Sequence, residues 1–365
     1  MLAPPAFDWL TVVVLLTPLP LVVVANLGVK HEWARITTLV LGGCLAGFIG
    51  IASALVMVGA IVARSNPQVA QAGEASLLLM GGSALMFAIL PTEVRAWLAR
   101  FLPLDPRSPV HYLALTLMIA VASFQLWSQI ASDVLAASST LPAVTKVDLV
   151  AQEVPLLLAG LLGVGTFIRR PPAEAAARIG WVVPRWWHVA AALGAAGAFF
   201  VLGNGFDYLG HLLTPGLAHK VDVTNQHLMG GLGDPAGIAT VALAAGICEE
   251  ALFRGALQPR MGILWTSLVF ALIHSQYGLS FDTLAVLVLG SGLGLLRRFL
   301  NTTSSTITHV TYNVLAGTGV TGPLIGVALA AEAVLIAVGG VGFFTERRNH
   351  DGAPKELLSA APERQ

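Results

Sequence analysis

The sequence predicts an all-α fold, a polytopic transmembrane helical bundle of about eleven spans. Of the 365 residues, 56% are hydrophobic and 11% are charged, whereas a soluble domain carries about 25% charged residues. The mean hydropathy is +0.77, and apolar stretches long enough to cross a bilayer recur along the chain. This composition excludes a soluble globular protein and a disordered chain.

Charge and cysteine content narrow the class further. The formal net charge is +0, so no basic footprint marks a nucleic-acid partner. Cys44 and Cys248 are the two cysteines, and both lie in apolar runs. This placement excludes a disulfide framework and argues against a cysteine-based metal site. The lipid bilayer is therefore the expected environment.

The spans follow from the rule that a membrane helix needs about 20 apolar residues. Pro18 and Pro20 fit inside the first span because membrane helices tolerate kinks. Asp234 and Pro235 begin the seventh, since Asp is a favourable N-cap and Pro suits the first helical turn. The eighth and tenth spans, like the third, are short or weakly apolar. In order, the expected spans cover residues 9–29, 36–63, 75–91, 111–136, 148–168, 188–209, 236–258, 262–276, 281–299, 302–317 and 322–343.

Basic residues alternate between the loops that these spans define. Sixteen Lys and Arg residues fall in the odd-numbered loops and in the tail after the last span, and three fall in the even-numbered loops. Cytoplasmic loops carry an excess of Lys and Arg. We therefore expect a multi-pass protein of the cell (inner) membrane, with its N-terminus outside and its C-terminus in the cytoplasm.

Ionisable residues inside a span are costly and are functional candidates by default. In the seventh span, Glu250 and Arg254 are four residues apart and share a helix face, which favours an ion pair between them. Glu249 lies about 100° around the helix from Glu250 and is left without a helical partner, as suits a general base. Four further acidic residues stay unassigned: Asp133, Glu153, Asp207 and Glu332.

Polar residues on two other spans reach the same level of the membrane. His274 lies in the eighth span, and His309 and Asn313 lie four residues apart in the tenth. At a rise of 1.5 Å per residue, these three and Glu249 lie roughly 10–18 Å from the cytoplasmic ends of their spans. Three helices thus offer polar groups at one depth, which favours a shared site over unrelated interface contacts.

These residues resemble the three motifs of the CPBP family, the CAAX-protease and bacteriocin-processing intramembrane proteases, which include type II prenyl-protein proteases. The motifs are Glu249-Glu250-x-x-x-Arg254, Phe270-x-x-x-His274 and His309-x-x-x-Asn313. The resemblance covers roughly residues 234–343, and it implies a catalytic membrane core there. Residues 1–233 would then form an N-terminal transmembrane region, and residues 344–365 a cytoplasmic polar tail.

The resemblance implies an intramembrane endopeptidase that cuts a peptide bond near the cytoplasmic leaflet. Glu249 would activate water, supported by Glu250 and Arg254, and Asn313 would stabilise the oxyanion. His274 and His309 would orient the water or, together with Glu249, bind zinc; a metal-dependent enzyme and a metal-free glutamate protease both stay open. The implied partner is a peptide or protein substrate, of which a prenylated, membrane-anchored CAAX protein is the prototype.

Several alternatives fit less well. The alternative hypothesis is a non-proteolytic membrane protein that retains the protease scaffold, such as a transporter or an immunity factor. No internal repeat supports a transporter. Gly231-Leu232-Gly233-Asp234 resembles an aspartyl-protease motif, but Asp234 suits a helix N-cap better. His211, His219 and His227 have no metal-ligand spacing, and we expect a solvated loop there.

Overall fold

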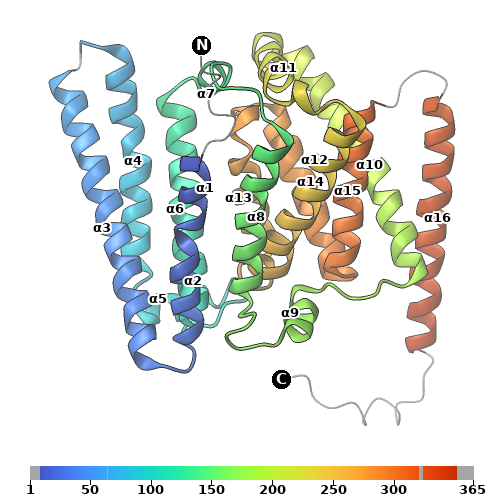
Figure 1. The fold of residues 1–365 in the computed structure, drawn as a ribbon, viewed down its shortest axis with the longest axis horizontal. Coiled ribbons are helices and arrows are strands. Elements are labelled where there is room, and N and C mark those ends of the chain that lie inside the picture. The colour runs from blue at the N-terminus through green and yellow to red at the C-terminus, as the bar shows by residue number, and fades with distance from the viewer. Residues whose placement is uncertain (1–8, 64, 320–323, 352–365) are drawn as a thin grey trace.

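The computed structural model describes residues 9–63, 65–319 and 324–351. Its helices stand side by side in one bundle, with α3 and α4 at one edge and α16 at the other (Figure 1). The all-α prediction is confirmed for these residues. The helices are α1 (Trp9–Leu16), α2 (Pro18–Leu27), α3 (Glu32–Val62), α4 (Pro67–Ala88), α5 (Thr92–Leu98), α6 (Pro109–Ala131), α7 (Val134–Ser138), α8 (Lys146–Gly163), α9 (Pro172–Ile179), α10 (Trp186–Leu213), α11 (Pro215–Met229), α12 (Pro235–Glu249), α13 (Gln258–Ile273), α14 (Phe281–Phe299), α15 (Thr302–Thr318) and α16 (Leu324–Asp351). Three shorter elements complete the set: the 3-10 turns η1 (Gly230–Leu232) and η3 (Ser275–Tyr277), and the π-helix η2 (Glu250–Leu257).

Each expected span overlaps a helix, but the count of about eleven spans is not confirmed. By length and apolarity, four helical segments among the described residues could cross a membrane: Glu32–Val62, Pro109–Ala131, Trp186–Leu213 and Pro235–Ile273. A fifth is added if α4 and α5, which bend by 103° at their junction, count as one broken span. The chain is thus a helical membrane protein whose number of crossings stays a prediction.

The longest of these segments, Pro235–Ile273, is a hairpin rather than one straight helix. Gly262 interrupts it with φ of 78° and ψ of 173°, a left-handed conformation that glycine adopts at no steric cost. The Glu249 Oε1 and His274 Nε2 atoms lie 4.0 Å apart in this fold, whereas a straight helix would separate the two residues by roughly 37 Å along its axis. The expected break between the seventh and eighth spans therefore corresponds to this turn.

The N-terminal helices pack through small side chains. α3 runs along α4, and α4 packs on α6. A Cβ atom at Gly73 of α4 would overlap Ala60 of α3, and one at Gly82 would overlap Ser123 of α6. Close backbone approach of this kind is the usual way that membrane helices gain packing energy.

Short helices close both ends of the bundle: α5 and α9 lie at one end, and α7 and α11 at the other (Figure 1). His211, His219 and His227 are exposed as expected, but the loop predicted for them is wrong, because His211 lies on α10 and the other two lie on α11. Asp234 caps α12 as expected, accepting a hydrogen bond from the Gly237 N–H at 2.7 Å. The expected polar tail begins as helix, since α16 extends to Asp351, and residues 352–365 lie outside the described residues.

Candidate active site

The first residues of the site lie where the helix type changes from an α-helix to a π-helix. α12 ends at Glu249, and the π-helix η2 carries Glu250 and Arg254, where the sequence predicted one continuous α-helix. Pro259 supplies a physical reason, because it has no N–H to bond the Gly255 carbonyl and its ring would crowd that carbonyl in an α-helix. Such π-turns are frequent at functional sites.

The Glu250–Arg254 pair forms as predicted. The Arg254 Nε and a Glu250 carboxylate oxygen are 3.5 Å apart, and both side chains are 0% exposed. The guanidinium lies 4.8 Å from the centre of the Phe270 ring, on its face, in a cation–π arrangement. Its nitrogens form no hydrogen bond with the described residues, so the ion pair and the aromatic face are the partners that hold this charge.

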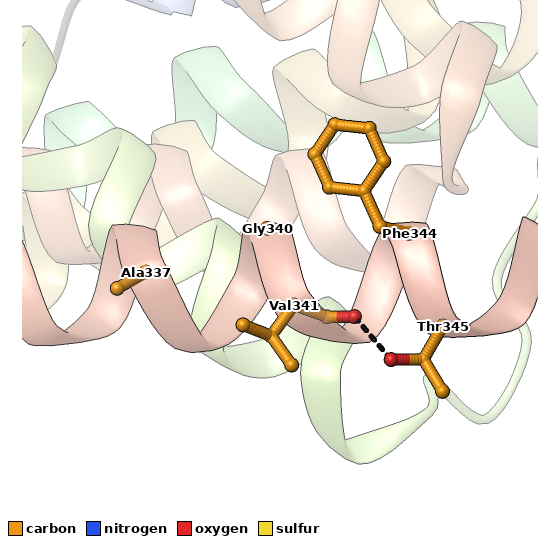
Figure 2. Close-up of a pocket in the computed structure, with 5 residues that line it drawn as sticks. All are labelled: Ala337, Gly340, Val341, Phe344 and Thr345. Atoms are coloured by element: carbon orange, nitrogen blue, oxygen red, sulfur yellow. Dashed lines mark hydrogen bonds between the residues drawn. The ribbon is translucent and has the colours of Figure 1, made fainter.

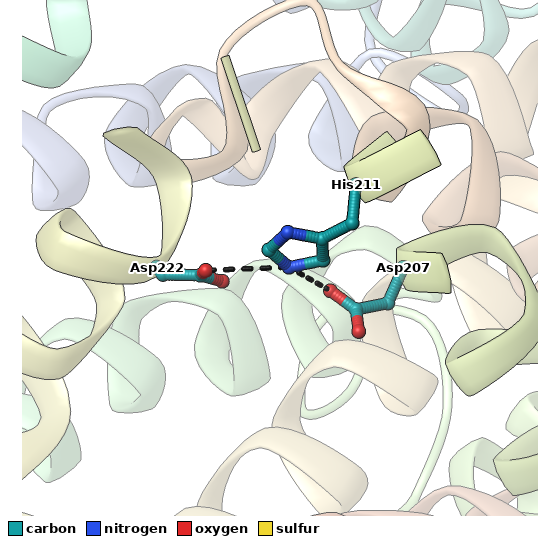
Figure 3. Close-up of side chains that lie close together, drawn as sticks. All are labelled: Asp207, His211 and Asp222. Carbon is teal, nitrogen blue, oxygen red and sulfur yellow. Dashed lines mark ion pairs between the residues drawn. The ribbon is translucent and has the colours of Figure 1, made fainter. Parts of the chain in front are cut away.

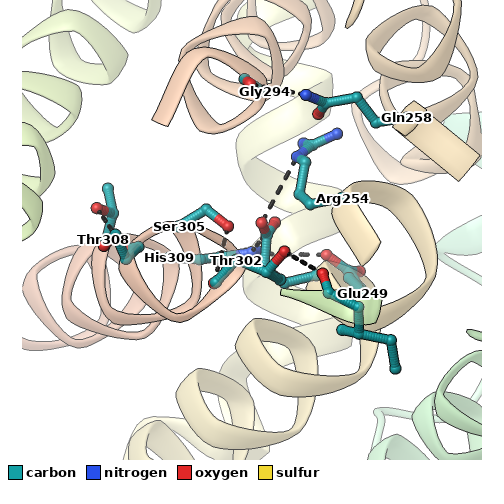
Figure 4. A network of polar contacts seen from close by, with 11 residues as sticks. Glu249, Arg254, Gln258, Gly294, Thr302, Ser305, Thr308 and His309 are labelled. Carbon is teal, nitrogen blue, oxygen red and sulfur yellow. Dashed lines mark hydrogen bonds and ion pairs between the residues drawn. The ribbon is translucent and has the colours of Figure 1, made fainter. Parts of the chain in front are cut away.

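His309 on α15 connects the two glutamates. Its Nδ1 lies 3.2 Å from Glu250 Oε1, and its Nε2 lies 3.8 Å from Glu249 Oε2. If Nδ1–H donates to Glu250, the Nε2 lone pair points at Glu249. Figure 4 shows His309 and Glu249 meeting in this way, with Arg254 above them.

His274 is held in the same manner by a different acceptor. It directly follows α13, and its Nδ1 lies 2.7 Å from the Phe270 carbonyl oxygen, which can only accept a hydrogen bond. The Nδ1 atom therefore carries the proton, and the free Nε2 lies 4.0 Å from Glu249 Oε1. The sequence placed His274 within a span, and the structure places it at the helix end.

Glu249 is thus faced by two imidazole nitrogens from other helices. Separations of 3.8 and 4.0 Å are too long for direct hydrogen bonds and suit a bridging water. The Glu249 side chain is 7% exposed, His309 9% and His274 19%, so the cluster opens towards His274. Glu249 Oε2 has no hydrogen-bond partner among the described residues.

The other candidate residues lie in different places. Asn313 follows His309 by one turn of α15 and is half-buried; its amide forms no hydrogen bond with the described part of the chain. Glu153 of α8, which the sequence left unassigned, is 8% exposed and has an unpartnered Oε2 within the described residues. It is close enough to Glu249 for the two carboxyl groups to interact electrostatically. Its position in the middle of an apolar helix was the only sequence signal for this.

Glu332 does not join the cluster. It packs against Gly197 of α10 and accepts a hydrogen bond from the Ala198 N–H at 3.2 Å. Nearby on α16, a shallow surface hollow is lined by Ala337, Gly340, Val341, Phe344 and Thr345 (Figure 2). It shares no residue with the glutamate–histidine cluster.

The residue types of His274, His309 and Glu249 fit zinc, but their spacing is wider than a zinc site. Tetrahedral coordination at about 2.0–2.1 Å brings ligand atoms to roughly 3.3 Å of one another. Among the described residues, one group brings three possible ligand atoms within 4.8 Å of one another: Asp207, His211 and Asp222. His211 lies between the two carboxylates on the exposed opposite end of the bundle (Figure 3).

Comparisons with known proteins agree with the motifs. A family model described as type II CAAX prenyl endopeptidase Rce1-like matches residues 232–315, which contain every motif residue. Searches of curated proteins and of solved structures found no match. Residues 232–315 therefore form a domain of the Rce1-like CAAX protease family, and the family predicted from the three motifs is confirmed.

Proposed function

We propose that this chain is a CAAX-type intramembrane endopeptidase that hydrolyses a peptide bond with a water activated by Glu249. The observation that carries the proposal is the gap between the Glu249 carboxylate and the Nε2 atoms of His309 and His274, 3.8 and 4.0 Å wide. A water in this gap would meet one proton acceptor and two nitrogen lone pairs. The family match supports a protease.

In this mechanism Glu249 takes a proton from the water as its oxygen attacks the scissile carbonyl carbon. The same carboxyl group then gives that proton to the departing amine nitrogen as the carbon–nitrogen bond breaks. The two imidazoles orient the water, and each is fixed through Nδ1 by a separate acceptor. Asn313 is the candidate donor to the carbonyl oxygen, since an amide N–H stabilises the developing oxyanion.

Glu250 and Arg254 are proposed as positioning residues. Glu250 holds the His309 ring through Nδ1, and Arg254 compensates the Glu250 charge in a site that water does not reach. A carboxylate behind a histidine fixes the ring's orientation and raises its basicity. This pair therefore controls the direction in which His309 Nε2 points.

A cleavage assay in detergent tests the proposal, with prenylated and unprenylated CAAX peptides as alternative substrates. Glu249→Gln keeps the side-chain shape and removes the base, so we expect turnover to fall by about 10²–10⁴. Glu332→Gln is the matched control, since it neutralises another glutamate of an apolar helix outside the cluster. If Glu249→Gln cleaves as fast as the wild type, the protease proposal fails. The non-proteolytic scaffold protein is then favoured.

Zinc remains the alternative to metal-free catalysis. Bound by His274, His309 and Glu249, it would lower the pKa of a coordinated water to about 7. Asn313 is a poor zinc ligand, and Glu249 cannot easily be both ligand and base. The metal-free mechanism predicts that strong chelators leave peptide cleavage unchanged. Lost activity that returns with added zinc would establish the metal instead.

The orientation is also proposed. With about eleven spans, the N-terminus lies outside and the C-terminus in the cytoplasm, and the end of the bundle that carries α9 faces the cytoplasm. A reporter fused after Arg348 should then read cytoplasmic, and one inserted within residues 211–233 should read external. The opposite readings would overturn this topology.

A further inference from the structure

Five arginines gather at the end of the bundle where α9 lies. Arg169 and Arg170 follow α8, Arg178 lies on α9, Arg260 begins α13, and Arg297 ends α14. Four separate segments of the chain bring the guanidinium groups together: Arg297 lies against Gly180 at the end of α9, and the other four groups are close enough to interact electrostatically with one another. The cluster lies outside the glutamate–histidine site, and the proposed mechanism uses none of these residues.

Contacts at the C-terminal end of α8 hold three of the groups. The Arg260 NH2 donates to the Gly163 carbonyl at 3.2 Å, and Arg170 donates to the Val164 carbonyl at 2.5 Å. Arg169 lies against Gly165 and donates to Asn26 at 2.8 Å. A helix C-terminus carries only about half a negative charge, so it does not balance this set.

No acidic side chain of the described residues forms an ion pair with the cluster. Within the described ranges, none of the five guanidinium groups has a carboxylate oxygen within 4.0 Å, the limit for an ion pair. Arg178 and Arg260 each lie close enough to other arginines of the cluster to interact electrostatically with them. Arginine cannot lose its proton inside a protein, so the repulsion persists.

Burial makes this arrangement costly without an anion. Arg260 is only 4% exposed, and its Nε finds no hydrogen-bond partner in the described chain; the same is true of the buried Nε of Arg297. An uncompensated buried charge is strongly destabilising. The positive-inside rule accounts for arginines in solvated loops, but it does not account for the unused buried donors of Arg260 and Arg297.

The surroundings of the cluster are apolar and open. Phe167, two residues before Arg169, is 82% exposed, and Val183, in the segment that follows α9, is 95% exposed. Exposed aromatic and aliphatic side chains beside basic groups are typical of the membrane–water interface. A ligand here meets cations and an apolar border together, as a phospholipid does.

We infer that this arginine cluster binds the phosphate group of an anionic phospholipid. Guanidinium groups form paired, charge-assisted hydrogen bonds with phosphate oxygens, and basic pockets between membrane helices accept anionic head groups. Arg178 and Arg297 supply the donors for the ligand, because neither donates a hydrogen bond within the described chain. The three arginines at the end of α8 form the base of the site.

The test is lipid binding by the purified full-length protein in detergent, measured by native mass spectrometry and by thermal unfolding. Phosphatidylglycerol should bind more tightly than phosphatidylcholine and raise the Tm. In Arg178→Gln/Arg297→Gln, the affinity for phosphatidylglycerol should fall at least tenfold, because the double variant loses the charge-assisted hydrogen bonds of both arginines to the phosphate. Arg298→Gln, an exposed neighbour, is the matched control and should bind as the wild type does.

The remaining outcomes separate the explanations. Without lipid, the double variant should have an unchanged or higher Tm, because two repelling charges are gone. A lower Tm combined with unchanged lipid binding would show a purely structural role and overturn the inference. Equal stabilisation by inorganic phosphate would keep the phosphate site and overturn the lipid as its source. Displacement of phosphatidylglycerol by a peptide with a free C-terminal carboxylate would assign the site to substrate instead.

Discussion

Helices α3 and α4 associate through small side chains, whereas the core formed by α12, η2, α13, α14 and α15 associates through buried charged and polar side chains as well. The buried residues of α3 are all small, with no charged group among them: Ala34, Thr38, Gly42, Ala46, Ser53 and Ala60. The π-helix in the core buries Glu250 and Arg254 completely and ties them to α13 and α15 through Phe270 and His309.

This comparison distinguishes the packing that holds two helices together from the contacts that fix their position along each other. In lipid, apolar side chains gain little by meeting each other, so small residues that let backbones approach supply the packing. Such contacts are spread along the helices and are not directional. Charged and imidazole groups each need one specific partner, so the core fixes the depth at which its helices meet.

The largest change in stability is expected in the core. Glu250→Gln leaves Arg254 buried without its counter-charge, and breaking a buried pair in this way costs about 3–5 kcal/mol. Glu249→Gln is the matched comparison, because Glu249 faces histidines rather than the arginine. Its unfolding temperature should stay near that of the wild type, and equal destabilisation of the two variants would remove the proposed division of roles.

A smaller loss is expected between α3 and α4. The Cβ added by Gly73→Ala would overlap Ala60 on the facing helix, and overpacking of this kind costs about 1–3 kcal/mol. Gly81→Ala on the same helix meets nothing within 4 Å, and it should be neutral or stabilising by helix propensity. Thermal unfolding of both variants measures the difference, and peptide cleavage per folded molecule should not change in either.

The smallest effect is expected at two exposed ion pairs on the α11 end of the bundle. The Lys220 ammonium, 2.9 Å from Asp133, lowers the pKa of that carboxyl group, and Lys146, 2.7 Å from Asp234, does the same there. Both carboxyl groups normally titrate near 3.8.

A lowered folded-state pKa stabilises the protein above the ordinary pKa, and this contribution disappears as the pH falls through the folded value. The unfolding temperature should therefore drop slightly more below pH 4 in the wild type than in Asp133→Asn. High salt should reduce the difference, because exposed pairs are screened. Identical pH profiles would mean that these pairs contribute nothing.

Local chemistry in the sequence was enough to find the motif residues, the Glu250–Arg254 pair and the Asp234 cap. It missed features that depend on distant segments. The π-helix was missed because residue spacing alone assumes 3.6 residues per turn. Both neighbours of Glu249 come from helices that return only after the turn at Gly262. The roles assigned to the site residues stay predictions.

The arginines illustrate the same limit. Arg260 entered the sequence reasoning only as one of the basic residues counted in the loops, since a sequence alone does not show burial or which distant residues lie close together. Glu153 was seen but not assigned, because its nearness to Glu249 depends on how α8 packs on α12. Gly160 also lets α8 approach η2, as a Cβ there would lie 2.9 Å from the Ala251 backbone carbon.

Phe270 makes the three motifs mechanically inseparable. Its ring face supports Arg254, its ring edge approaches His309 with centroids 6.2 Å apart, and its carbonyl oxygen sets the His274 ring. The same ring also lies 4.7 Å from the His274 ring, centroid to centroid, so a shift of the ring disturbs the ion pair and both imidazoles at once. The positions of these side chains therefore depend on one aromatic ring, and a substrate that displaces it would misalign Arg254, His274 and His309 together.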